Sequence, residues 1–196
     1  SYMGAKILHP DTVLPVREKN IPIVIKNIFN PHYKGTRISN NTNNKFKAVT
    51  GKNGYALLKI TRTMEYDEVK FFYSLFEILN SFKLTNLSFH QSIDCIYLYL
   101  RENELNNIEK QLLKQIKTLN ISGCNIIKNV SLITMVGENI IFKNLLGKIK
   151  KLFTKNNIGI LTYKINCHGS YIAIGISSEY FNQAITELNN ICINKK

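Results

Sequence analysis

Most of the chain beyond residue 55 shows one of two hydrophobic patterns. Short apolar runs predict strands, and longer segments with apolar residues three or four positions apart predict amphipathic helices. In the clearest helix, predicted over residues 68–81, one face carries Phe72, Leu75, Phe76 and Leu79. We therefore expect a mixture of helices and strands that share an apolar core.

The same order of elements, strand, helix, strand, strand, helix, occurs twice. In the first copy we predict strands at 56–61, 85–91 and 95–100 and helices at 68–81 and 105–117. In the second copy we predict strands at 130–136, 158–164 and 170–176 and helices at 142–154 and 179–191. Each copy needs one more strand to complete a ferredoxin-like βαββαβ unit, with two helices against one face of an antiparallel sheet. Pairing of two copies, side by side or across a dimer, would cover the open sheet edge.

The residues ahead of the repeat follow a different pattern. Residues 3–17 predict a short helix-like segment, which we expect Pro10 and Pro15 to break. Residues 21–26 predict a strand buried on both faces, as in a parallel sheet, because Ile-Val-Ile runs without polar alternation. The polar tract at 39–44, Ser-Asn-Asn-Thr-Asn-Asn, is expected to be a linker.

Composition and charge narrow the class of protein. A chain of 196 residues with 44% hydrophobic content can bury a substantial core, and no apolar run approaches the length of a membrane helix. The sequence thus indicates a soluble, cytoplasmic protein. Its net charge of +13 is spread along predicted solvent faces, as at Lys148, Lys150 and Lys151, so we expect no nucleic-acid partner. Steeply salt-dependent binding of DNA or RNA would favour that alternative.

The cysteines and histidines of this chain do not show the spacing that is typical of metal sites or catalytic sites. The four cysteines lie far apart, without a Cys-x-x-Cys pair, so we predict no metal site. His90 and His168 fall at equivalent points of the two copies, near the turn between the middle strands. Since neither has an evident nucleophile or carboxylate partner, we predict structural turns and no catalytic residue.

Several short motifs resemble a known family. Gly-Ala-Lys-Ile-Leu-His-Pro at 4–10, Ile-Pro-Ile at 21–23, Lys-Asn-Ile-Phe-Asn-Pro at 26–31 and Gly-Thr at 35–36 resemble the end of the aspartate kinase catalytic domain. The doubled unit is similar to the tandem ACT domains that follow in that family. Val-Ser-Leu-Ile-Thr-Met-Val-Gly at 130–137 resembles the opening strand of the family's second ACT domain.

The resemblance implies a fold and a domain order. The expected class is α+β: tandem ACT domains preceded by a partial α/β amino-acid-kinase segment. Since the family's first ACT domain is inserted into the second, residues 1–43 would be the kinase remnant and linker, and 55–127 the first ACT domain. Residues 44–54 and 128–196 would form the second. The strand at 46–50 would then join the sheet built by 128–196.

The resemblance also implies the parent reaction, in which ATP, with Mg²⁺, phosphorylates the side-chain carboxylate of L-aspartate for lysine, threonine and methionine synthesis. Lys6, beside Ile7, corresponds to a nucleotide-binding lysine of the family, where an ammonium can neutralise phosphate charge. The family's Lys-Phe-Gly-Gly loop has no counterpart here, so we expect no kinase activity from this chain alone. It would act with an upstream kinase catalytic domain or as a separate regulatory subunit. The alternative is a stand-alone amino-acid-binding or dimerisation ACT module.

In the family, ACT pairs bind a feedback amino acid at the loop after the first strand and at a facing strand, and they form homodimers. Carried over by position, the effector would be lysine or threonine, and the candidate site residues are Met64, Glu65, Glu68, Phe71, Phe72, Thr85, Asn86 and Leu87. The loop lacks the usual glycine and carries acids at 65, 67 and 68. These acids either hold the ammonium of a basic effector or favour the helix N-terminus through its dipole, and we favour the second interpretation.

Overall fold

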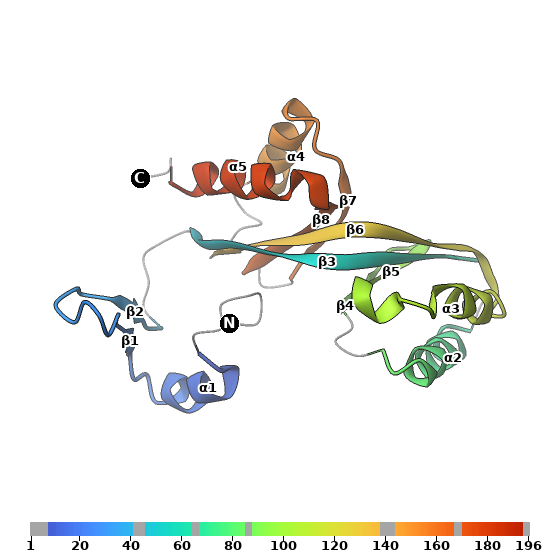
Figure 1. Cartoon of the computed structure of the whole chain (residues 1–196), viewed down its shortest axis with the longest axis horizontal. Coiled ribbons are helices and arrows are strands. Elements are labelled where there is room, and N and C mark those ends of the chain that lie inside the picture. Colours follow the sequence, from blue (N-terminus) through green and yellow to red (C-terminus); the bar gives the residue numbers. More distant parts are fainter. Residues whose placement is uncertain are drawn as a thin grey trace.

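The computed structural model describes residues 8–40, 46–63, 67–84, 88–137, 144–166 and 170–193. A small N-terminal segment comprises α1 (Pro10–Glu18), β1 (Ile23–Ile25) and β2 (Thr36–Ile38). The rest is built on one six-stranded antiparallel sheet with four α-helices (Figure 1). The α+β class predicted from the sequence is confirmed.

The first helix corrects one prediction. Pro10 is the first residue of α1 and Pro15 lies inside it, so neither breaks the helix in the part that is described. Proline suits a first helical position, where its missing N–H would have no intrahelical partner. His9 precedes it as the N-cap, and its side chain accepts a hydrogen bond from the backbone N–H of Asp11 at 3.4 Å. The helix is short and exposed, so water can solvate the carbonyl that Pro15 leaves unpaired.

The strand predicted at 21–26 is also corrected. β1 pairs antiparallel with β2, and its central residue, Val24, is 51% exposed, so it is not a doubly buried parallel strand. An apolar run is buried on both faces only where other elements cover both faces. The turn between the strands includes Gly35, whose φ of +73° and closeness to the Ile25 carbonyl leave no room for a side chain.

The six-stranded sheet has the order β4-β5-β3-β6-β8-β7. Its two central strands each contain 17 residues and run through both halves of the fold (Figure 1). The strands are β3 (Phe46–Arg62), β4 (Ser88–Gln91), β5 (Cys95–Arg101), β6 (Ile121–Gly137), β7 (Ile160–Ile165) and β8 (Tyr171–Ser177).

The long strand β3 contributes to both halves. Its first part, from Phe46 to Lys52, pairs with β6 between Leu132 and Gly137, as predicted for residues 46–50. Its second part pairs with β5 on one side and with the first part of β6 on the other. The sequence predicted two separate strands, 46–50 and 56–61, whereas the structure has one strand with register shifts near its middle, where Gly54 has a φ of +80°.

The helices form one pair for each half. They are α2 (Glu68–Ser81) and α3 (Glu109–Ile116) in the first half, and α4 (Leu145–Lys155) and α5 (Phe181–Ile193) in the second. α2 has the predicted bounds. α3 begins four residues later than predicted, because a 3₁₀ turn at Glu102–Leu105 and Asn107, with a φ of +70°, come first. α5 likewise begins after a 3₁₀ turn, Ser178–Tyr180, and the predicted start of α4 lies outside the described residues.

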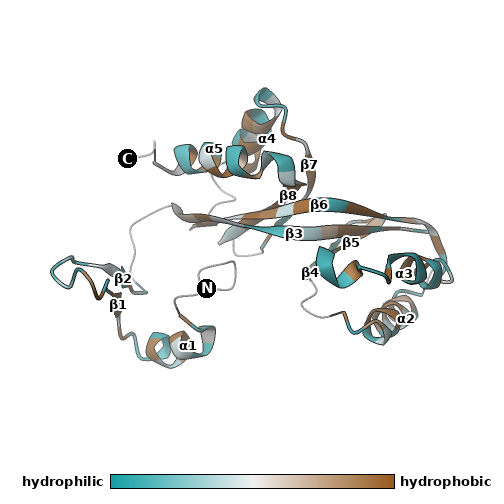
Figure 2. Cartoon of the chain, viewed as in Figure 1, coloured by the Kyte–Doolittle hydropathy of each residue, from teal (hydrophilic) through white to brown (hydrophobic). Residues whose placement is uncertain are grey.

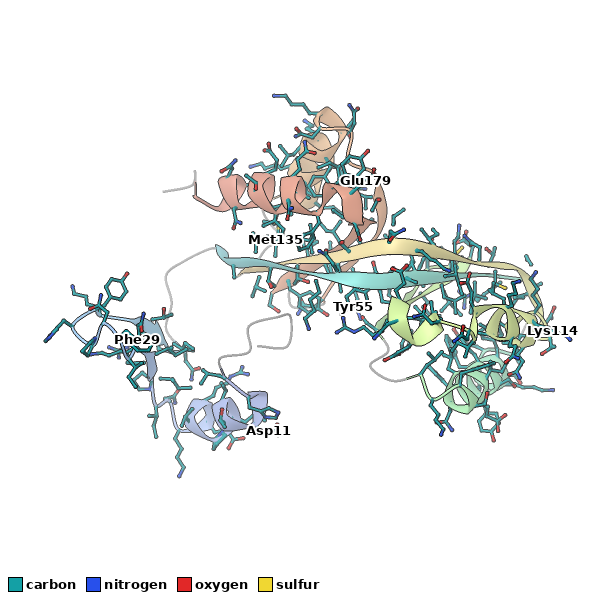
Figure 3. All side chains as sticks on the ribbon, viewed as in Figure 1. Asp11, Phe29, Tyr55, Lys114, Met135 and Glu179 are labelled. Atoms are coloured by element: carbon teal, nitrogen blue, oxygen red, sulfur yellow. The ribbon has the colours of Figure 1, made fainter. Side chains whose placement is uncertain are left out.

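Each helix pair encloses a core against the sheet. The helices are amphipathic, with both hydrophilic and hydrophobic residues along each of them (Figure 2). The first core centres on Leu58, Leu75 and Leu112, and the second on Met135, Ile149 and Leu188. A third core is made by alternate residues of the same strands: Tyr55, Leu57, Tyr99, Val130, Leu132 and Ala173. Figure 3 shows Met135 and Tyr55 on opposite sides of the sheet.

The third core exists because the sheet curls on itself. β4 and β5 thereby contact β7 and β8, although these strands lie at opposite ends of the strand order. The Lys164 ammonium on β7 donates to the Phe89 carbonyl of β4 at 3.3 Å, for example. The two halves are therefore joined by shared strands and by a direct contact between their helix-free faces.

Candidate functional site

A cavity of about 540 Å³ lies where β3 ends and α2 begins. It is bounded by the first two turns of α2 and by the connection from α3 to β6. The lining residues are Asp67, Lys70, Phe71, Ser74, Thr118, Leu119 and Asn120. This is the region in which the sequence placed the effector loop.

The start of α2 is set by its N-cap, Asp67. Its backbone is extended and its carboxylate accepts a hydrogen bond from the Lys70 N–H at 3.0 Å. This bond satisfies one of the free N–H groups of the first turn and places a negative charge at the positive end of the helix dipole. Phe71 is buried and anchors the same turn in the first core. An acid and an apolar residue thus position the helix end that lines the cavity.

Glu68 has a different set of contacts. Its carboxylate lies 3.5 Å from the Arg62 guanidinium and 3.4 Å from the Gln91 side-chain amide. Arg62, at the end of β3, also donates to the carbonyls of Ser92 and Ile93, at 2.6 and 2.5 Å. Arg62 is nearly buried, so these bonds tie the first turn of α2 to the turn between β4 and β5. The negative charge of Glu68 is therefore already balanced by a cation of the same chain.

Phe72 lies on another side of α2 and is not among the residues that line the cavity. Its ring stacks with Phe76 at 6.0 Å between centroids and is tilted against Phe89 of β4 at 6.3 Å. Phe76 and Phe89 meet edge to face at 5.8 Å. We call these three residues the aromatic cluster, and two of them, Phe76 and Phe89, remain more than a third exposed.

Three of the predicted site residues are described, and Glu68, Phe71 and Phe72 all lie in the first turn and a half of α2. Of these three, Phe71 lines the cavity, whereas Glu68 and Phe72 do not. The other predicted site residues lie outside the described residues: Lys6, Ile7, Met64, Glu65, Thr85, Asn86 and Leu87. Arg62 and the segment 118–120 were not among the predicted site residues. The available signal was weak: a cation at the end of an apolar strand, and a polar turn between two predicted elements.

His90 corrects another prediction. It lies within β4 and not in a turn, and its Nε2 atom contacts the Thr162 hydroxyl of β7. His168 lies outside the described residues. Cys95 is buried and Cys124 half-buried, both as free thiols. Within the described ranges, no group of His, Cys, Asp and Glu side chains could hold a metal ion. None of the helices described is long and apolar enough to cross a membrane.

No family model matches this sequence. Among curated proteins, the bifunctional aspartokinase/homoserine dehydrogenase of Buchnera aphidicola is 28% identical over 207 residues, covering 100% of this chain and 25% of the relative. Aspartokinase 3 of Bacillus subtilis is 27% identical over 143 residues, covering 70% of this chain and 32% of the relative. The chain therefore spans about a quarter to a third of these relatives.

Solved structures share the fold over nearly the whole chain. The aspartate kinase of Clostridium acetobutylicum superposes with a TM-score of 0.84 and 24% identity, covering 97% of this chain and 46% of that one. Aspartokinase III of E. coli, in complex with lysine and aspartate, superposes with a TM-score of 0.78 and 19% identity, covering 98% of this chain and 44% of that one. The regulatory subunit of aspartate kinase from Thermus flavus superposes with a TM-score of 0.61 and 11% identity, covering 74% of this chain and 97% of that subunit.

Proposed function

We propose that this chain, which is similar to the C-terminal ACT part of aspartokinases, is the regulatory portion of an aspartate kinase. The observation that carries the proposal is the doubled βαββαβ unit built on two shared 17-residue strands, in a chain whose relatives are aspartokinases. The parent enzyme would phosphorylate L-aspartate with ATP and Mg²⁺. Lys6 and Ile7 would contribute to its nucleotide site.

We assign residues 55–127 to the first ACT domain, 44–54 with 128–196 to the second, and 1–43 to the end of the kinase domain and the linker. Strand pairing supports this division. The first part of β3 pairs with the second part of β6, and the second part of β3 pairs with β5. The boundary near residue 54 falls at the register shift in β3.

An upstream kinase catalytic domain is the proposed partner of the N-terminal segment. Large apolar side chains are exposed there, among them Ile28 at 85% and Phe29 at 94% (Figure 3). Ile21, Val24 and Tyr33 are each more than half exposed. So many exposed apolar groups in one short segment are typical of a surface that another domain covers.

A second copy of this chain is the proposed partner of α2 and β4. β4 ends the strand order of the sheet, so it presents backbone groups to another strand. On α2, whose Phe72 and Phe76 contact Phe89 of β4, Val69 is 81% exposed and Tyr73 is 65% exposed. Pairing of two copies at this edge would cover both features. Tyr73→Glu should shift the chain toward monomer in sedimentation, whereas the control Tyr163→Glu, in the second half, should not.

The proposed effector is lysine or threonine, bound in the cavity at the start of α2, where Phe71 is the predicted site residue among the described lining residues. E. coli aspartokinase III, a structural neighbour, has been solved in complex with lysine and aspartate. The cavity here offers an ammonium at Lys70, hydroxyls at Ser74 and Thr118 and the Asn120 side chain, which suit a small zwitterion.

Calorimetry with lysine, threonine and methionine in turn tests the effector. One of the first two should release heat. Lys70→Met should weaken its binding about tenfold, the loss of one charge-assisted contact worth about 1.4 kcal/mol. Lys148→Met, on α4, is the control and should bind as the unaltered chain does. No heat with any of the three would overturn the effector assignment.

Assays of aspartate phosphorylation test the parent activity separately. The chain alone should show none, and the same chain with its natural upstream sequence should phosphorylate aspartate with ATP. An upstream sequence without a Lys-Phe-Gly-Gly segment, or a full-length protein without activity, would contradict the assignment to a kinase.

A further inference from the structure

The contact between His90 and Thr162 joins the helix-free faces of the two halves. The residues are 72 positions apart and come from β4 and β7, the first and last strands in the sheet order. The imidazole stacks on the Tyr97 ring, with 5.0 Å between centroids and 18° between planes. Its ring is therefore held flat by β5 while its Nε2 atom reaches β7.

Thr162 links this imidazole to a second aromatic residue. The Thr162 side chain also lies beside the Tyr99 phenol of β5, since both border the space at Gly175, and both residues are buried. In the tautomer that holds its proton on Nδ1, the neutral imidazole of His90 accepts the single proton of the Thr162 hydroxyl at Nε2.

The surroundings of His90 oppose a positive charge on it. Burial of the imidazole, and secondarily the Lys164 ammonium, lower the pKa of His90 from its ordinary value of 6.5. Lys164 is held close, since it donates to the carbonyl of Phe89, the preceding residue. The titratable groups that these contacts place around the imidazole are Lys164 of β7 and the phenols of Tyr97 and Tyr99 of β5.

We propose that the His90–Thr162 contact is a pH-sensitive latch, which holds β4 and β5 against β7 and β8 while the imidazole is neutral and loosens when it is protonated. Protonation turns Nε2 into a donor, so the hydroxyl proton of Thr162 loses its acceptor. It also sets a second cation beside Lys164 in a partly buried contact. Both changes act on the same junction between the halves.

The sign of the pH dependence follows from linkage. His90 binds its proton more weakly in the folded chain than in the unfolded chain, so acid favours the unfolded or opened form. The stability that the neutral imidazole contributes is present above pH 6.5 and is lost as the pH falls from there through the lowered folded pKa. His90 is thus a positioning residue whose effect depends on pH.

Urea unfolding of the whole chain between pH 8 and 5 tests the latch, with His90→Gln as the variant that cannot titrate. As the pH is lowered below 6.5, the urea concentration at the unfolding midpoint should decrease for the unaltered chain. It should decrease less for His90→Gln. His32→Gln, which removes an exposed histidine of the N-terminal segment, is the matched control and should keep the full slope. Equal slopes for His90→Gln and the unaltered chain would overturn the proposal.

Two further measurements remain decisive if His90→Gln folds poorly. The imidazole resonances of His90 should titrate below pH 6.5, and Lys164→Met should move that titration to higher pH. Amide hydrogen exchange of residues 88–91 and 160–165, corrected for its intrinsic pH dependence, should accelerate together as His90 protonates. A His90 imidazole that titrates at or above pH 6.5 would refute the latch. Amide exchange rates that do not change as His90 protonates would also refute it.

Discussion

Tyr99 and Gly175 touch across the two halves of the molecule. The phenol hydroxyl of Tyr99, on β5, occupies the space that a Cβ atom on Gly175 of β8 would need. Thr162 borders the same space from β7. The helix-free faces are therefore fitted closely enough that a single methyl group on one half would collide with the other.

Gly175→Ala should lower the free energy of unfolding by about 1–3 kcal/mol, the usual cost of overpacking a core. Gly159→Ala is the control, because nothing lies within 4 Å of its added Cβ. Tyr99→Phe, which removes the obstructing hydroxyl, should recover part of the loss in the double variant. Additive effects of the two substitutions in urea unfolding would contradict the contact.

Arg62→Met should destabilise the first half by about 1–3 kcal/mol, because the Ser92 and Ile93 carbonyls lose a charged donor. Glu68→Gln should cost less than about 1 kcal/mol, since the Glu68 side chain is more than half exposed. Urea unfolding measures both. A larger loss from Glu68→Gln than from Arg62→Met would show that the ion pair, and not the carbonyl contacts, holds this turn.

Gly51→Ala probes the part of β3 that belongs to the second half. A Cβ there would lie 2.5 Å from the Phe181 ring of α5, so we expect a loss of about 1–3 kcal/mol by thermal or urea unfolding. Phe181→Leu should relieve the collision. Gly123→Ala, on β6 with open space around it, is the control. Equal stability of the Gly51 and Gly123 variants would argue against packing of α5 on this part of β3.

Asp94→Asn should change the acid stability of the turn between β4 and β5. Hydrogen bonds from Ser92 and from the Asp94 backbone lower the pKa of Asp94 from its ordinary value of 3.8. A carboxylate with a lowered pKa in the folded chain stabilises the fold at pH values above its ordinary pKa of 3.8. This stabilisation is lost as the pH falls through the folded pKa. The urea midpoint of Asp94→Asn should lie below that of the unaltered chain at pH 7, and the gap should close as the pH falls below 3.8. A gap independent of pH would rule out this role.

Much of the fold followed from local patterns. The helical spacing of four apolar residues, Phe72, Leu75, Phe76 and Leu79, predicted α2 with its observed bounds. The doubled order of elements indicated two βαββαβ units. The pairing of 46–50 with the second half came from a family resemblance. Local patterns failed where cover by other elements mattered: Val24 lies in an apolar run, yet it is exposed.

The candidate site divides in the same way. Glu68, Phe71 and Phe72 were carried over by position from a family resemblance, and their role as site residues stays a prediction. Arg62 and Asn120 were not, since their roles come from a turn and a strand end that the sheet brings together.

The amino-acid order by itself determined the helices, most strands and their repetition, because burial on one side of an element leaves a period of 3.6 or 2 in the residues that form it. Only the tertiary structure decided that β3 and β6 run through both halves, and that His90 meets Thr162 and Tyr99 meets Gly175. Such contacts depend on how a sheet curls. Curling arises from twist and register shifts summed over many residues, and it leaves no periodic trace at the positions it joins.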